Sequence, residues 1–86
     1  MQWKLFADLA EVAGTEEPTV ETDGDTVGEA LSALLSAHPD LAARVTDDDG
    51  ELRPHVNLLH EGEPADLDTP VSEGDELALF PPVSGG

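Results

Sequence analysis

The sequence predicts an α+β roll, in which a mixed sheet of four to five strands wraps over one main helix. Two observations carry the prediction. Residues 27–37 have apolar side chains at helical spacing, and short segments near both ends of the chain alternate apolar and polar residues. The chain has 86 residues, which is enough for one domain only. The simplest way to bury both apolar surfaces is to pack the sheet on the helix.

The N-terminal part predicts two strands and a short helix. Residues 2–6 alternate and predict the first strand. Residues 7–13 predict a short helical turn that ends at Gly14. Residues 15–22 are mostly polar, and we expect them to form a second strand at the edge of the sheet.

The main helix has the clearest start signal in the chain. Thr26 can cap its N-terminus and Glu29 can reach back, as in a capping box. We expect the helix to span residues 27–37, because a proline follows closely and restricts the residue before it. Asp40 is then expected to cap a second short turn, over residues 40–45.

The C-terminal half predicts a loop followed by more strands. Residues 47–50 are expected to form the loop, residues 56–60 a strand, and residues 63–65 a segment that pairs back on it. Residues 76–80 alternate again and predict the last strand, which a Pro-Pro pair terminates. The predicted core combines one face of the strands with the helix stripe: Trp3, Leu5, Val27, Leu31, Leu34, Leu35, Val56, Leu58, Leu77 and Leu79.

The composition bounds the function. With 20 acidic and 3 basic residues, the net charge is −17, so we expect no binding to nucleic acid or to a membrane. High charge and few aromatic residues are typical of disorder, but the apolar periodicity favours a folded chain. The chain has no cysteine and no long apolar segment, so a cytoplasmic protein is expected. The acidity suits a halophilic host, although an acidic mesophilic protein is an alternative.

No residue pattern predicts a catalytic or metal site. The acidic run at residues 47–50 lacks the spacing of a calcium loop and suits a solvated turn. His38, His55 and His60 are too scattered for a zinc site, and no cysteine supports them. No carboxylate pair or nucleophile with its base is visible, so we expect a protein that is not an enzyme and holds no cofactor.

The C-terminal tail is the most informative segment. We expect one domain over residues 1–82 and a flexible tail over residues 83–86 that ends in Gly85-Gly86. A frayed terminus is the simplest interpretation. However, the Pro-Pro pair stiffens the exit, and glycines can thread a narrow tunnel because they lack side chains. The ionised terminal carboxylate could then attack the α-phosphate of ATP in another protein and become an acyl-adenylate.

Two segments resemble a known family. The C-terminal run from Gly74 to Gly86, GDELALFPPVSGG, is similar to the end of the ubiquitin-like β-grasp sulfur carriers. These include the small subunit of molybdopterin synthase, the thiamine sulfur carrier and the haloarchaeal small archaeal modifier proteins. The start from Trp3 to Glu11, WKLFADLAE, resembles the modifier proteins as well. The likeness covers the whole chain and implies a ubiquitin-like β-grasp fold.

The resemblance implies a protein modifier and sulfur carrier. An activating enzyme similar to the ubiquitin-activating enzymes would use ATP and Mg²⁺ to adenylate Gly86, with Gly85 providing clearance. The adenylate would become a thiocarboxylate that donates sulfur to a molybdopterin precursor or to tRNA, or an isopeptide bond to a substrate lysine. The large subunit of molybdopterin synthase would be a further partner.

The resemblance also implies docking residues. Aromatic residues on the open face of the sheet bind partners in the molybdopterin branch, and Phe6 and Phe80 match those positions. Both alternate away from the predicted core, and Leu59 is expected on the same face; alternatively, the two phenylalanines are edge residues of the core. Lys4, the only lysine, is a possible acceptor for a second copy of the tag.

Two other functions fit the same sequence. One is a dedicated molybdopterin synthase subunit that never tags proteins. The other is an acidic interaction domain that is never activated and mimics phosphate toward a basic partner.

Overall fold

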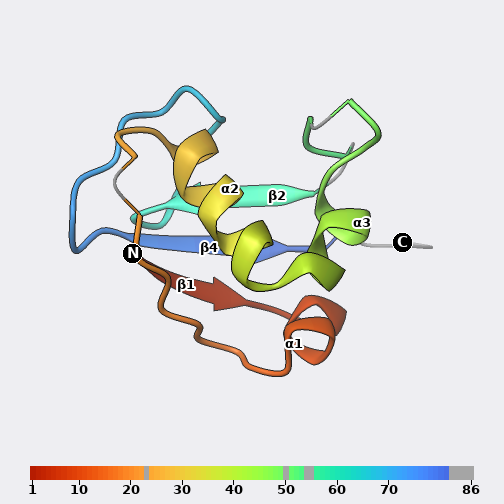
Figure 1. Ribbon diagram of the computed structural model, residues 1–86. Coiled ribbons are helices and arrows are strands. Elements are labelled where there is room, and N and C mark those ends of the chain that lie inside the picture. Colours follow the sequence, from red (N-terminus) through yellow and green to blue (C-terminus); the bar gives the residue numbers. More distant parts are fainter. Residues whose placement is uncertain (23, 50, 54–55, 82–86) are drawn as a thin grey trace.

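The expected α+β roll is confirmed by a computed structural model, which describes residues 1–22, 24–49, 51–53 and 56–81 (Figure 1). One four-stranded mixed sheet packs on the main helix, α2. The elements in chain order are β1 (Gln2–Leu5), α1 (Asp8–Ala13), α2 (Val27–Ala37), η1 (Pro39–Leu41), α3 (Ala42–Val45), β2 (Asn57–His60), β3 (Glu63–Pro64) and β4 (Glu76–Phe80).

The last strand lies in the centre of the sheet. The strand order is β1-β4-β2-β3, so the two ends of the described chain meet side by side. Strands β1 and β4 are parallel, with Trp3 opposite Leu77 and Leu5 opposite Leu79. Strand β2 runs antiparallel to β4 and pairs on its other side with the short β3. The parallel pairing brings the C-terminal ends of β1 and β4 to the same edge of the molecule.

Helix α2 begins and ends where the sequence predicts. The Thr26 hydroxyl accepts a hydrogen bond from the Glu29 backbone N–H at 3.3 Å, which satisfies one of the donors at the helix start. The capping box is not fully reciprocal, because the Glu29 carboxylate accepts from the backbone of Asp25 instead of that of Thr26. Helix α2 ends at Ala37, one residue before His38 and two before Pro39.

The core lies between α2 and the inner face of the sheet. Eight of the ten predicted core residues are buried; Leu35 and Val56 are partly buried and pack at its margin. Leu9, Leu41, Val45 and Val71 are also buried, because α1, η1, α3 and the segment before β4 close the ends of the core. The indole N–H of Trp3 is buried without a hydrogen-bond partner among the described residues.

The predicted second strand over residues 15–22 is wrong as a regular element. The segment does run antiparallel along the free edge of β1, where Pro18 O accepts from Trp3 N at 3.0 Å and Glu16 O accepts from Leu5 N at 2.8 Å. Only an isolated bridge between Gln2 and Thr19 forms. Pro18 has no backbone N–H, so a continuous ladder cannot be completed at this point.

The expected cap at Asp40 is also wrong. The short turn exists as η1 and α3 and buries Leu41 and Val45 as expected. However, Asp40 lies inside η1, His38 occupies the position before it, and no side-chain cap bond forms there. The predicted loop at residues 47–49 is confirmed, with Asp47 Oδ1 accepting from the backbone of Asp49 and Glu51.

Candidate functional site

An aromatic pair lies on the open face of the sheet, opposite α2. The rings of Phe6 and Phe80 stack, with centroids 4.1 Å apart and planes 9° from parallel. Phe6 is 38% exposed, whereas its neighbour in sequence, Leu5, is buried. The backbone N–H of Phe6 donates to Leu79 O at 3.3 Å, which extends the β1–β4 pairing by one residue and holds the rings together. Both phenylalanines therefore lie outside the core, as the alternation predicts.

Two further apolar residues extend this surface across the sheet. Leu59 of β2 lies opposite Ala78 of β4 and opposite Pro64 of β3. Ala78 alternates with the buried Leu77 and Leu79, so its side chain belongs to the open face. We refer to Phe6, Leu59, Ala78 and Phe80 as the open-face patch. Ala78 was not predicted as part of this surface, although the alternation of β4 places it there.

The single lysine borders the open-face patch. Lys4 lies opposite Ala78 in the β1–β4 register, and its ammonium group lies 3.6 Å from Glu76 Oε1. Both side chains are 42% exposed, so solvent screens this ion pair and it adds little to stability. A charged border around an apolar centre is typical of a protein-binding surface.

A strained turn positions Phe6. Ala7 has φ 53° and ψ −131°, and Leu9 N donates to Phe6 O at 3.2 Å across it. These angles match the first central position of a type II′ turn, which glycine normally occupies. The turn connects β1 to α1, so Phe6 is the last residue before the chain turns away from the sheet.

The tail leaves the sheet beside the aromatic pair. Strand β4 ends at Phe80, and Pro81 is the last described residue. The predicted activation residues Gly85 and Gly86, together with Pro82, lie outside the described residues. Because β1 and β4 are parallel, Phe6 and Phe80 both lie at the edge of the sheet from which the chain continues toward its C-terminus.

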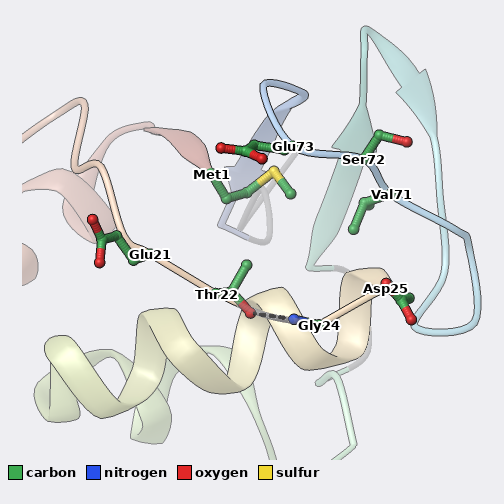
Figure 2. Close-up of a pocket in the computed structure, with 8 residues that line it drawn as sticks. All are labelled: Met1, Glu21, Thr22, Gly24, Asp25, Val71, Ser72 and Glu73. Carbon is green, nitrogen blue, oxygen red and sulfur yellow. Dashed lines mark hydrogen bonds between the residues drawn. The ribbon is translucent and has the colours of Figure 1, made fainter.

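A pocket lies at the opposite edge of the sheet, near the starts of β1 and β4. It has a volume of about 520 Å³, and Figure 2 shows Glu21 and Asp25 on the segment before α2 and Glu73 on the turn before β4. In the same view, the Thr22 hydroxyl accepts from Gly24 N at 3.1 Å. In the described parts of the chain, no three histidine, aspartate or glutamate side chains are placed to hold a metal ion.

The structure describes two of the three histidines, His38 and His60. His38 lies at the end of α2, and His60 Nε2 lies 2.7 Å from Asp75 Oδ2. The hydrogen bond from His60 and a second one from the Ser72 backbone hold the pKa of Asp75 below its ordinary value. His55 lies outside the described residues. Among the described helices, none is both long and apolar enough to cross a membrane.

Comparison with known proteins places this arrangement in a family. The chain is 63% identical to small archaeal modifier protein 1 of Haloferax volcanii over the full length of both. It is 40% identical to the molybdopterin synthase sulfur carrier subunit of Escherichia coli, over 95% of this chain and 94% of that one.

The fold and the sequence agree on the same group. A crystal structure of the Haloferax volcanii modifier superimposes with a TM-score of 0.94, at 63% identity, covering 100% of this chain and 98% of that one. The fold is thus the ubiquitin-like β-grasp. Residues 3–86 match the ThiS family, and the chain belongs to that family of ubiquitin-like modifiers and sulfur carriers.

Proposed function

We propose that this protein is both a protein modifier and a sulfur carrier that is activated at Gly86. One observation carries the proposal: a stacked aromatic pair, of which Phe6 is exposed and Phe80 is half-buried, lies at the end of β4, before the segment that ends in Gly85-Gly86. An enzyme that grips the open-face patch would find the terminal glycines within the reach of a short tail. The names of the two relatives, a modifier and a sulfur carrier, support this function.

The proposed chemistry begins with the terminal carboxylate. A carboxylate oxygen of Gly86 attacks the α-phosphorus of ATP, the bond to the β-phosphate oxygen breaks, and pyrophosphate leaves with Mg²⁺. Hydrosulfide that displaces AMP then gives a thiocarboxylate for sulfur transfer to a molybdopterin precursor or tRNA. A lysine amine that displaces AMP from the adenylate, or that displaces the enzyme thiol from a thioester formed from the adenylate, gives an isopeptide bond. The carrier supplies no catalytic residue in this scheme and acts as the substrate.

The proposed partners follow from the same surface. The open-face patch would dock on the activating enzyme and, in sulfur transfer, on the large subunit of molybdopterin synthase. Aromatic residues of this kind often dominate binding energy at interfaces. Lys4 is an exposed amine, but it lies on the border of the patch, so a tag attached there would obstruct docking. We therefore propose that single tags predominate over chains.

Intact mass spectrometry of the protein purified from its host tests the sulfur-carrier part. The expected result is a fraction heavier by the mass difference between sulfur and oxygen, with the gain located in the C-terminal peptide. A gain located at Met1 would be methionine oxidation instead. Complete absence of the thiocarboxylate in cells that are making molybdopterin would contradict the proposal.

A dedicated sulfur carrier without tagging is the second candidate, favoured by the 40% identity to the Escherichia coli subunit. Immunoblotting of an epitope-tagged copy separates the two. Discrete bands of high mass that vanish when the last two glycines are deleted support tagging. Sulfur transfer without such bands supports the dedicated carrier.

A further inference from the structure

Both arginines of the chain line one pocket at the tail edge of the sheet. The pocket has a volume of about 470 Å³, and Arg44 and Arg53 lie on its wall together with Asp8, Ala7 and Pro81. The chain has only three basic side chains against 20 acidic ones. Two of the three therefore meet at a single hollow, beside the point where the described chain ends.

Hydrogen bonds hold both guanidinium groups in place without engaging all of their N–H donors. Arg44 Nη1 donates to Asp8 Oδ2 at 2.6 Å, and Arg53 Nε donates to Ala43 O at 2.9 Å. The backbone N–H of Arg53 also donates to Val45 O at 2.9 Å, which fixes the residue against α3. Each guanidinium has five N–H donors, so most donors remain for a ligand. Asp8 offsets one of the two positive charges, and the pocket keeps the other.

This pocket favours an anion on an otherwise acidic molecule. With a net charge of −17, most of the surface repels negative groups, whereas this pocket holds two of the three basic side chains and one carboxylate, Asp8. The planar fork of arginine pairs with the two oxygens of a carboxylate or of a phosphate. On an unmodified protein surface such oxygens belong to aspartate and glutamate, so a carboxylate side chain is the ligand that fits a protein partner.

The pocket adjoins the aromatic pair along the chain. Its lining residues Ala7 and Pro81 directly follow Phe6 and Phe80, although neither ring lines the pocket itself. A protein that covers the rings and receives the tail would lie against the pocket. We propose that the Arg44–Arg53 pocket binds an aspartate or glutamate side chain of the activating enzyme; this inference rests on the proposed function.

Chain length argues against a nucleotide phosphate as the ligand. Five residues follow Pro81, and an extended segment of that length spans about 17 Å. An adenylated Gly86 in an extended tail therefore lies far from the pocket. In the free protein, a tail that folds back instead of extending would bring its own carboxylate to the pocket, and there it would compete with the enzyme for the same donors.

Steady-state ATP–pyrophosphate exchange with the purified activating enzyme tests the inference. The variant Arg44→Gln/Arg53→Gln is compared with Ser32→Glu/Ser36→Glu, which makes the same net-charge change on the exposed side of α2. We expect the KM for the carrier to rise roughly tenfold in the arginine variant, with kcat unchanged and no such rise in the serine variant. The variant Arg44→Lys/Arg53→Lys should lie between it and the wild type.

Every outcome of this exchange assay either supports or contradicts carboxylate binding at the Arg44–Arg53 pocket. An equal rise in the glutamine and serine variants would show a net-charge effect and overturn the inference, as would no change in either. A lower KM in the glutamine variant would identify the chain's own tail as the occupant. Failure of the wild-type chain to support exchange would instead contradict the proposed function itself. If the double variant fails to fold by circular dichroism, the single variants Arg53→Gln and Arg44→Lys carry the test.

Discussion

Phe6 and Phe80 come from opposite ends of the chain, yet their rings stack at 4.1 Å on the outer face of the sheet. Stacked aromatic pairs contribute about 0.5–1.5 kcal/mol beyond the area that they bury. The parallel pairing of β1 and β4 creates this contact, and it places the pair beside the exit of the tail. One strand arrangement thus brings the two rings together at the edge of the sheet where β4 ends.

Substitution of Phe80 should weaken binding to the activating enzyme more than it destabilises the fold. Phe80→Ala is expected to weaken binding to the activating enzyme by about 2 kcal/mol or more, because the ring is a candidate anchor. The loss of unfolding free energy should be smaller than that of Leu77→Ala, which opens a cavity in the core at a cost of about 2–5 kcal/mol. Calorimetric titration and denaturant unfolding measure the two effects. A Phe80→Ala chain as destabilised as Leu77→Ala would place the ring in the core.

The turn at Ala7 offers a stabilising substitution. Ala7→Gly should raise the unfolding free energy by about 1 kcal/mol, because native strain at such angles costs more than the added freedom of the unfolded chain. Ala37→Gly, at the end of α2, is the matched control and should destabilise. Trp3 is the only tryptophan and is fully buried, so its fluorescence follows global unfolding. Equal losses in both variants would show that Ala7 is not strained.

Most of the fold could be predicted because its signals are local. The stripe of α2, the Thr26 cap and the alternation of β1 and β4 are each contained within a few residues. The prediction of a strand over residues 15–22 was wrong because Pro18 has no backbone N–H to donate. The pairing of this segment therefore depends on the backbone donors of two segments together. Leu9 and Val71 lie in segments without periodicity, and only the closed roll shows that they are buried.

Part of the candidate site could also be predicted from the sequence. Alternation placed Phe6, Leu59 and Phe80 on the open face, and the register confirms that placement. The stacking of the rings and the contribution of Ala78 depend on strand order, which the sequence does not state. The arginine pocket depends on tertiary contacts that join α1, α3 and the end of β4, so no sequence motif predicts it.

The Asp75–His60 pair predicts a specific acid dependence. Because the folded-state pKa of Asp75 is lowered, its ionised form stabilises the native protein above the unfolded pKa of about 3.9. That contribution is lost as the pH falls through the lower folded-state pKa. Measured in molar salt, the stability difference between wild type and Asp75→Asn should shrink as the pH falls below about 5. His60→Gln should reduce the same dependence, whereas parallel acid curves for wild type and Asp75→Asn would contradict it.

Salt should stabilise the fold strongly. Twenty carboxylates share the chain with three fixed cations, and self-repulsion opposes compaction. The Debye length falls from about 30 Å at 0.01 M to about 3 Å at 1 M, so molar KCl removes most of this repulsion. The thermal midpoint should rise steeply over that range. Asp48→Asn/Asp49→Asn, two exposed positions, should raise the midpoint in low salt and change little in molar salt. A midpoint that stays flat would show that repulsion does not limit the fold.

The proposed function depends on activation at the terminal glycine, which ATP–pyrophosphate exchange measures. The full chain is compared with a chain that ends at Ser84, under identical enzyme and salt conditions. Both should unfold at the same temperature, because glycines bring no side chain to the core. We expect exchange with the full chain and none above background with the shortened one. Equal exchange with the two chains would contradict the assignment of Gly86 as the reacting residue.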